Sequence, residues 1–307
     1  MGTTKKIKKA ARNPGIVINF IRRKVDESAS KTFYGNVAGF RHNLIGSKKM
    51  SQGKLRLALN DSEKEIVTEL KESGLYVLKS PYNKSLFDTI KSKYDKLIED
   101  KESSFVRTEY KGKVYSRQVK SIYDYIPEMS QLLTDDIIRL IEGYYNSHFQ
   151  VLHLMAWRNY HVPPEIVAES ETFSDRWHCD RRNTDIFKLM ILLSDVTEED
   201  GPMHVQPIER TSKLVKKGFG NRKKYNLSED VMEDPKYTFK TIGPPGTGLL
   251  CNLQLCLHRA SIPAPGHTRD LIQFQFIPSK EPLWDDWVKR IETKANEMRK
   301  TKNPSIT

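Results

Sequence analysis

The sequence predicts an α+β protein in which a block of helices precedes a double-sheet β-barrel or jelly roll. Two observations support this prediction. From Asn60 to Asn146 the apolar residues recur at helical spacing, whereas after Ser147 they form strand-like runs separated by Gly and Pro turns. The chain has 307 residues, 37% of them hydrophobic and 29% charged, which is typical of a globular protein with a substantial core.

The first helix is expected over Glu63–Glu72, with Asp61 or Ser62 as its N-cap and Gly74 at its end. A short apolar strand follows at Leu75–Leu78. Three further helices are expected: one that opens at Asn83 or Ser85 and carries Leu86, Ile90, Tyr94 and Leu97 on one face, a short one at Pro127–Leu133, and one at Asp135–Asn146.

Longer strands are expected in the second half of the chain, at Phe149–Tyr160, Phe187–Leu193, Gly248–Leu257 and Leu271–Ile277. In the last of them, Leu271, Gln273, Gln275 and Ile277 face one way, and Ile272, Phe274 and Phe276 face the other. We therefore place the barrel core at about residues 149–278, within a main domain of residues 58–290 that is followed by a C-terminal tail of residues 291–307.

The basic charge of the chain is concentrated before the main domain. Residues 1–50 hold twelve Lys and Arg against Asp26 and Glu27, so they carry +10 of the net charge of +12. Two alternatives remain for this basic extension, residues 1–57. It is a solvated, loosely ordered tail, which its block of like charge favours, or it associates weakly through residues 1–25 with an anionic membrane surface or an acidic partner.

The apolar segments and the cysteines favour a cytoplasmic location. The apolar run from Gly15 to Ile21 is too short to span a membrane, and no secretory signal is evident. Cys179, Cys251 and Cys256 are odd in number and lack zinc-type spacing, which predicts reduced thiols. We expect a cytoplasmic protein, peripheral at a membrane if its basic extension binds one.

The first candidate metal ligands are His178 and Asp180. In an extended chain, residues i and i+2 point the same way, so this imidazole and this carboxylate are directed to one point. Two ligands from one short segment and one distant histidine form the facial triad of a mononuclear iron(II) oxygenase, which leaves three coordination positions open. By itself a His-x-Asp pair is weak evidence, because such pairs are common on surfaces.

The distant ligand is expected to be His258, at the end of the apolar strand Leu249–Leu257. Eleven residues later, Arg269 opens the strand Leu271–Ile277, and an antiparallel turn through residues 261–266 would bring it back beside His258. The rigid fork of an arginine binds a carboxylate through two hydrogen bonds, which suits the distal carboxylate of a dicarboxylic keto acid. Each residue alone has an ordinary structural explanation; together, in this order, they favour the metal site.

Other residues compete for roles at this site. His204, His267, His161 and His153 are alternative third ligands, and His204 is also placed to touch substrate. Trp177 is expected to pack beside the ligand pair. Arg181 and Arg182 either attract an anionic substrate or lie in solvent. A basic stretch is expected to form either a lid over the site or a solvated loop; it comprises Lys213, Lys216, Lys217, Arg222, Lys223 and Lys224.

The sequence resembles the phytanoyl-CoA dioxygenase family of Fe(II)/2-oxoglutarate-dependent oxygenases, from about Glu69 to Pro278. The segments that carry the resemblance are Leu70–Leu78, Trp177–Asp180, Leu193–Val196, Asp200–Met203, and His258 with Arg269 at the eleven-residue separation of the family. The resemblance implies a double-stranded β-helix (a jelly-roll or cupin-like barrel) with N-terminal helices packed outside it. It also implies Fe(II) held by His178, Asp180 and His258, 2-oxoglutarate as co-substrate, and O2.

The same resemblance assigns further roles. Arg269 would bind the far carboxylate of 2-oxoglutarate, and Asn159 would contact the co-substrate from the preceding strand. Ser261 resembles a hydroxyl that helps to hold that carboxylate, although relatives carry it two residues after the histidine, where this chain has Ala260. Related halogenases lack the carboxylate ligand, so the presence of Asp180 implies hydroxylation or desaturation of a small-molecule, lipid or saccharide substrate, with 2-oxoglutarate converted to succinate.

Two rival functions remain. A catalytically inactive β-barrel of the same fold would serve only in binding. A basic nucleic-acid-binding protein is suggested by the pI of about 9.4, but the charge lies in the extension and no nucleic-acid-binding module is present, so we expect no specific nucleic-acid partner. Phosphate-binding loops, Rossmann fingerprints and serine-hydrolase elbows are also absent from the sequence.

Overall fold

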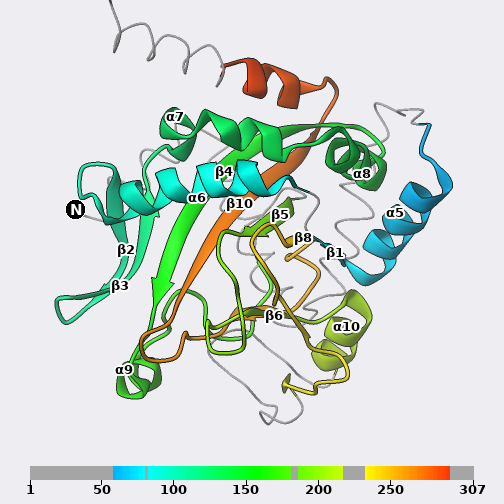
Figure 1. The fold of residues 1–307 in the computed structure, drawn as a ribbon. Coiled ribbons are helices and arrows are strands. Elements are labelled where there is room, and N and C mark those ends of the chain that lie inside the picture. Colours follow the sequence, from blue (N-terminus) through cyan, green and yellow to red (C-terminus); the bar gives the residue numbers. More distant parts are fainter. Residues whose placement is uncertain (1–57, 80–81, 181–185, 217–231, 291–307) are drawn as a thin grey trace, which may run out of the picture.

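A computed structural model describes residues 58–79, 82–180, 186–216 and 232–290 (Figure 1). The predictions for the basic extension, residues 1–57, and for the tail, residues 291–307, fall outside these residues. The same holds for Arg181, Arg182 and most of the basic stretch predicted as a lid. None of the described helices is long and apolar enough to cross a membrane.

The helical block follows the predicted order, but its first cap differs from the prediction. Helix α5 (Asp61–Ser73) is capped by Asn60, not by Asp61 or Ser62, because Asn60 and Glu63 form a reciprocal capping box. Gly74 ends α5 in the left-handed conformation, with φ 81°. The remaining helices of the block are α6 (Lys84–Glu99), capped by Asn83, then α7 (Ile122–Tyr125), the 3-10 helix η2 (Pro127–Leu132) and α8 (Asp135–Tyr145).

In the described part of the chain, ten strands form two antiparallel sheets, which confirms the α+β, two-sheet prediction in its coarse form. The larger sheet has seven strands in the order β1 (Leu75–Leu78), β8 (Gly248–Cys251), β5 (Phe187–Leu192), β10 (Thr268–Ser279), β4 (His148–Tyr160), β3 (Lys113–Val119) and β2 (Ser104–Tyr110). The smaller sheet has the order β7 (Phe239–Lys240), β6 (Met203–Val205) and β9 (His258–Ala260). Two further helices are α9 (Pro164–Glu169) and α10 (Ile208–Lys216).

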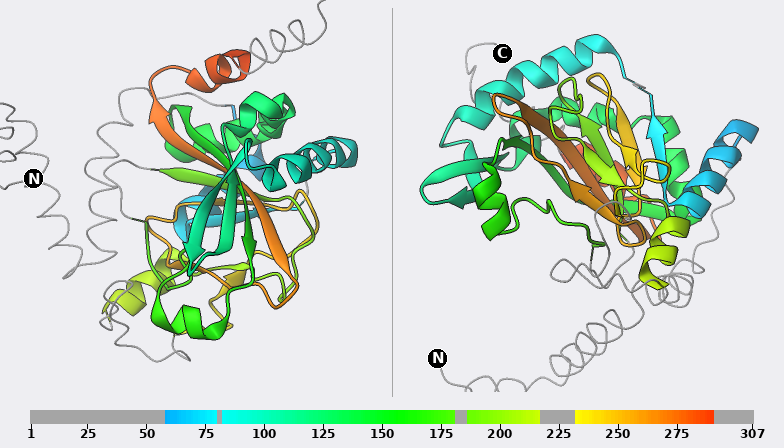
Figure 2. Two further views of the ribbon diagram at one scale, coloured as in Figure 1. Left: turned by 90° about the vertical axis from the view of Figure 1, so that its left-hand side faces the viewer. Right: turned by 90° about the horizontal axis from the view of Figure 1, so that it is seen from below.

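The two faces of the larger sheet have different partners (Figure 1). Helix α6 runs along one side of the long strands β4 and β10, and α10 and the loops of the smaller sheet lie on the other side (Figure 2). The alternation predicted for β10 is confirmed: Ile272, Phe274 and Phe276 pack with the helices in the main core, whereas Leu271 packs between the sheets. We therefore expect a functional site in the space between the two sheets.

Two features of the predicted second half are wrong in detail. The strand predicted over Gly248–Leu257 ends at Cys251, because a turn begins at Asn252. The carbonyl of Asn252 accepts hydrogen bonds from the amides of Leu255 and Cys256. Leu253, Cys256 and Leu257, which follow, are buried, but they do not lie in a strand. The predicted hairpin between His258 and Arg269 is also absent: β9 pairs with β6 in the smaller sheet, and β10 pairs with β4 and β5 in the larger one.

The backbone at Gly201 lies close to the backbone of Pro263. Gly201 has φ 67°, and a Cβ there would lie 2.5 Å from the backbone nitrogen of Pro263. Gly201→Ala is therefore expected to lower the free energy of unfolding by about 2 kcal/mol or more, from the left-handed conformation and the clash together. Urea unfolding measures this loss. Gly112→Ala is the control, since Gly112 also has positive φ, at 76°, but no atom lies within 4 Å of its added Cβ.

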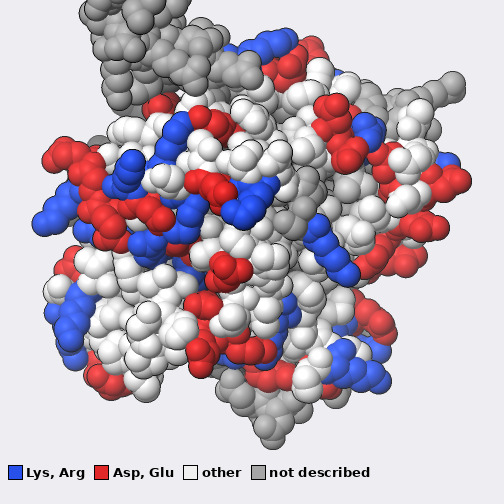
Figure 3. Space-filling model, viewed as in Figure 1, with Lys and Arg blue, Asp and Glu red and all other residues white. Residues whose placement is uncertain are grey.

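Charges of both signs are interspersed over the described surface (Figure 3). Acidic residues are numerous on α5, which begins with Asp61 and Glu63. The main domain thus lacks, on the face shown, the broad basic area that the net charge of the whole chain would suggest, in agreement with the concentration of basic residues before residue 58.

Candidate active site

A cavity of about 450 Å³ lies between the two sheets, a size typical of small-molecule sites. Its walls come from β4, β5 and β10 of the larger sheet and from β6 and β9 of the smaller sheet. His178, Asp180 and His258 all line it, as do Asn159 and Arg269. The structure therefore brings together five of the six residues predicted for the site; the sixth, Ser261, is not among the lining residues.

The two histidines are brought together by their backbones. The amide of His178 donates to the carbonyl of His258 at 3.0 Å, and the amide of His258 donates back at 2.8 Å. This bridge places the ring centroids 4.1 Å apart. Asp180 Oδ1 lies 3.8 Å from Nε2 of each histidine, and the three ligand atoms lie within 4.8 Å of one another. Two imidazole nitrogens and one carboxylate oxygen thus converge on one point.

The outer ring nitrogens of both histidines are already used. Nδ1–H of His178 donates to the carbonyl of Arg176 at 2.7 Å, and Nδ1–H of His258 donates to the carbonyl of Cys256 at 3.1 Å. With the proton on Nδ1, each Nε2 presents its lone pair to the convergence point. Backbone carbonyls that fix the tautomer and the ring orientation in this way are typical neighbours of metal-ligating histidines.

Lys188 on β5 holds the other oxygen of Asp180. Its Nζ donates to Asp180 Oδ2 at 2.5 Å, and both side chains are largely buried. Burial acts to raise the pKa of Asp180, but the Lys188 ammonium and the two histidines outweigh it and lower that pKa below its ordinary value. Asp180 is therefore ionised and directs a single oxygen, Oδ1, toward the histidines. The sequence analysis did not identify Lys188.

Arg269 lies at one end of the cavity and is 2% exposed. Among the described residues, its Nε and Nη1 have no hydrogen-bond partner. Burial, and then the nearby Arg107, lower the pKa of Arg269 to about 10. A buried guanidinium left in this state is costly unless it receives an anion, so the cavity is suited to a ligand that carries a carboxylate or a similar group.

Asn159 lies directly beside Arg269. The two residues are paired across β4 and β10, and Ser116 of β3 is paired with Asn159 on its other side. Asn159 is 1% exposed, and its Oδ1 accepts a hydrogen bond of 2.8 Å from Ser116 Oγ. This contact orients the amide at the cavity wall and leaves its nitrogen as the group that is able to donate.

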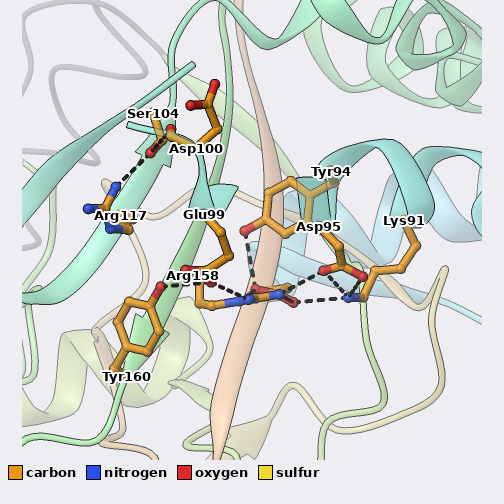
Figure 4. Close-up of polar contacts among 10 residues, drawn as sticks. Lys91, Tyr94, Asp95, Glu99, Asp100, Ser104, Arg117, Arg158 and Tyr160 are labelled. Carbon is orange, nitrogen blue, oxygen red and sulfur yellow. Dashed lines mark hydrogen bonds and ion pairs between the residues drawn. The ribbon is translucent and has the colours of Figure 1, made fainter. Parts of the chain in front are cut away.

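A charged cluster on the opposite face of the sheet fixes the register of the strands that carry Asn159 and Arg269 (Figure 4). Arg158 and Asp270 are paired across β4 and β10, and the guanidinium donates to both carboxylate oxygens, at 2.7 and 2.9 Å. Arg158 also donates to Asp95 and Glu99 of α6, each at 2.8 Å. Burial acts to lower the pKa of Arg158, but Asp270 outweighs it and raises that pKa.

Asp270 is the buried centre of this cluster, at 2% exposure, and it also accepts a hydrogen bond from the Tyr94 hydroxyl at 3.2 Å. Asp270→Ala is expected to lower the free energy of unfolding by about 3 kcal/mol, because it removes one partner of a buried pair. Tyr94→Phe removes only a hydroxyl and is expected to cost about 1 kcal/mol. Thermal or urea unfolding measures the loss of unfolding free energy in each variant. Equal losses in Asp270→Ala and Tyr94→Phe would contradict the central role given to Asp270.

The Ser261 hydroxyl contacts His204, not the cavity. Ser261 Oγ lies 3.0 Å from His204 Nε2, and His204 Nδ1–H donates to Glu233 at 3.0 Å. Glu233 also accepts a hydrogen bond from Trp177 Nε1 at 3.1 Å and forms an ion pair with Arg259 at 2.5 Å. Glu233, which the sequence analysis did not identify, thus contacts Trp177, the residue before His178, and Arg259, the residue after His258.

The competing histidines lie elsewhere. His161 Nδ1–H donates to the carbonyl of Pro263, and His267 pairs with Asp200 and Glu199. Neither of them lines the cavity, and His204 and His153 do not line it either. Of the described histidines, the cavity wall contains His178 and His258. Trp177 is buried, as expected of a packing residue, at 3% exposure.

The donor set fits a divalent transition metal. Two neutral imidazoles and one carboxylate on one side of a point are the ligands of a mononuclear non-haem Fe(II) site with open positions. The buried guanidinium of Arg269 in the same cavity, whose Nε and Nη1 have no partner among the residues that the structure describes, fits the acid group of an anionic co-substrate. The residues present are thus compatible with iron and with a dicarboxylic keto acid.

No protein-family model and no curated protein sequence matches the chain. Solved structures do match. The non-haem α-ketoglutarate-dependent epimerase SnoN from nogalamycin biosynthesis has a TM-score of 0.53 at 14% identity, covering 71% of this chain and 83% of its own. EctD from S. alaskensis, solved with 2-oxoglutarate and 5-hydroxyectoine, has a TM-score of 0.51 at 13% identity, covering 72% and 79%. The carbocyclase SnoK from the same biosynthesis has a TM-score of 0.50 at 15% identity, covering 72% and 85%. These likenesses show a common fold.

Proposed function

We propose that this protein is a non-haem Fe(II)/2-oxoglutarate-dependent dioxygenase that hydroxylates or desaturates a small molecule. The observation that carries the proposal is the presence, in one cavity, of the converging His178, Asp180 and His258 and of a buried arginine, Arg269, whose Nε and Nη1 have no partner among the described residues. Neither feature alone specifies the chemistry. A metal triad has many uses, and an unpaired arginine indicates only an anion.

Each residue has a definite task in this proposal. His178, Asp180 and His258 hold Fe(II), which, together with 2-oxoglutarate, supplies the activation of O2 that is coupled to decarboxylation of 2-oxoglutarate to succinate. Arg269 binds the far carboxylate of 2-oxoglutarate, and the Asn159 amide donates to the co-substrate from the neighbouring strand. Lys188 occupies Asp180 Oδ2, so that the carboxylate offers one oxygen and the remaining positions stay open.

The finer assignments belong to the same proposal. We infer a double-stranded β-helix core within an oxygenase domain of residues 58–290, and membership of the phytanoyl-CoA dioxygenase family. The placement of Ser261 against His204 supports a role in supporting the site, not in direct contact with 2-oxoglutarate. Similar solved structures contain small molecules, nogalamycin RO in SnoN and 5-hydroxyectoine in EctD, which supports a small-molecule substrate for this chain.

The test is the binding of 2-oxoglutarate, measured anaerobically by calorimetry with and without Mn(II), a divalent metal that binds carboxylate and carbonyl oxygens and takes the place of Fe(II). We expect Mn(II) to raise the affinity of wild-type protein for 2-oxoglutarate by about tenfold or more, and to have no such effect in His178→Ala. Succinate is the matched ligand, because it keeps a far carboxylate for Arg269 but lacks the keto acid group that binds metal. Its affinity is expected not to depend on Mn(II).

Metal-independent binding of 2-oxoglutarate by a folded wild-type protein would contradict the proposal. That result would favour the alternative function, a catalytically inactive barrel that binds an anionic ligand through Arg269. Binding of 2-oxoglutarate that depends on the metal in both wild type and His178→Ala would place the metal somewhere else.

A further inference from the structure

Arg107 is a second arginine in the cavity, and its position results from an irregularity in β2. Val106 is paired with Arg117 and Thr108 with Ser116, so Arg107 is the extra residue of a β-bulge and has no opposite residue on β3. A bulge changes the direction of the side chain that it carries, and bulges often accompany active sites. Arg107 lines the cavity, with its guanidinium 4.6 Å from the ring centre of Trp157.

Arg107 has no acidic partner among the described residues. Its charge acts on another cation of the cavity, since Arg107 lowers the pKa of Arg269. Of the described residues in the cavity wall, the cations are Arg107, Lys188 and Arg269, and the acid is Asp180, which Lys188 already binds. The described residues thus supply no carboxylate to either guanidinium of the cavity, and both are available to anionic ligands.

The two arginines differ in accessibility. Arg269 is fully buried, whereas Arg107 is exposed, because it comes from the edge strand β2 and solvent reaches it through the open cavity. Desolvation by the surrounding protein nevertheless lowers the pKa of Arg107. The guanidinium of one arginine is sufficient for one carboxylate in a bidentate arrangement, so a co-substrate bound at Arg269 leaves Arg107 available.

We propose that Arg107 binds an oxyanion of the substrate, a carboxylate, sulfate or phosphate group on a small molecule, and so sets the specificity of the site. This inference rests on the proposed function, which assigns Arg269 to 2-oxoglutarate. The cavity also offers apolar surface to the rest of the substrate, because Met155, Trp157, Phe173, Met203 and Leu271 are among the residues that line it. Trp157 also supports the guanidinium from one face and leaves its edge for the anion.

The experiment uses inorganic sulfate as the probe, titrated at constant ionic strength into full-length protein loaded with Mn(II) and saturating 2-oxoglutarate. Wild type is compared with Arg107→Gln and with the control Arg117→Gln. Arg117 has the same charge on the paired strand β3, but it donates to Ser104 Oγ and does not line the cavity (Figure 4). Calorimetry or tryptophan fluorescence reports binding.

We expect one saturable sulfate site in wild type and in Arg117→Gln, with an affinity lower by about tenfold or more in Arg107→Gln and partly recovered in Arg107→Lys. The affinity for 2-oxoglutarate is expected to be the same in Arg107→Gln and wild type. Equal sulfate binding in wild type and Arg107→Gln would overturn the inference, as would the absence of a saturable site in wild type. A loss of 2-oxoglutarate affinity as large as that of Arg269→Gln would also overturn it, because both arginines would then hold the co-substrate.

Failure of the proposed function gives a different result. In that case wild type shows no binding of 2-oxoglutarate that depends on Mn(II), and the sulfate titration is repeated on metal-free protein. Sulfate binding that Arg107→Gln abolishes and Arg269→Gln retains would then still support an anion site at Arg107, and the reverse pattern would exclude it.

Discussion

Asp180→Ala is expected to lower the affinity of the protein for Fe(II) by about a hundredfold or more and to abolish the conversion of 2-oxoglutarate to succinate. Asp180 provides the only anionic ligand atom of the triad, and Oδ1 lies at the same 3.8 Å from both Nε2 atoms. Removing it leaves two neutral imidazoles, which hold Fe(II) weakly. Equilibrium dialysis measures the metal affinity, and succinate formation measures the turnover.

Asp180→Ala has a second effect, on stability, that has to be separated from the first. The substitution leaves the largely buried ammonium of Lys188 without its carboxylate, which is expected to cost about 3 kcal/mol of unfolding free energy. The double variant Asp180→Ala/Lys188→Met removes both charges and is expected to recover most of this stability without recovering iron binding. Lys188→Met alone is expected to keep iron, because Asp180 Oδ1 is unchanged. Iron binding by the double variant at the wild-type level would contradict the assignment of Asp180.

Arg269→Met is expected to have opposite effects on function and stability. The affinity for 2-oxoglutarate should fall by about a hundredfold, because the far carboxylate loses a charge-assisted bidentate partner. The ligand-free protein should become more stable by about 1–4 kcal/mol, since an apolar side chain replaces a fully buried cation with two partnerless nitrogens. Calorimetry with 2-oxoglutarate and urea unfolding measure the two effects.

The pH dependence of the stability of the protein gives the sign of the stability effect of Arg269→Met independently. Burial and Arg107 lower the pKa of Arg269 to about 10, below its value in an unfolded chain. The charged form thus destabilises the ligand-free fold at all pH values below about 10, and this cost is relieved as the pH rises from there toward the pKa of the unfolded chain. At pH 7 the gain from Arg269→Met should be at its full size. A variant less stable than wild type without ligand would contradict the view that Arg269 is present for binding.

Much of the fold follows from local sequence patterns. The N-cap at Asn83, the end of α5 at Gly74 and the alternation along β10 were all predictable, since caps and strand periodicity are written in consecutive residues. The hairpin of β2 and β3 was not, because its turn uses Lys111–Gly112 instead of a common hairpin pair, and its strands carry many charges. The strands β6 and β9 have three residues each, too few to show a period.

The site was predictable where its residues lie on one strand or at a characteristic spacing. His178, Asp180, His258 and Arg269 are of this kind, and the structure places all four in one cavity. Lys188 carried a signal that was not used: a lone lysine within the buried strand Phe187–Leu192 requires an acidic partner. Arg107 carried no such signal, because a bulge depends on the pairing of two strands, and pairing is a property of the folded chain.

The central claim is that His178, Asp180 and His258 hold Fe(II) in a cavity where Arg269 receives 2-oxoglutarate. The most direct test is an anaerobic visible spectrum of metal-free protein titrated with Fe(II) and then with 2-oxoglutarate, in wild type, His178→Ala and Arg269→Met. We expect a charge-transfer band in wild type, no band in His178→Ala, and in Arg269→Met a band that requires about a hundredfold more 2-oxoglutarate. The absence of a band from folded wild-type protein, or an equal band in His178→Ala, would contradict the claim.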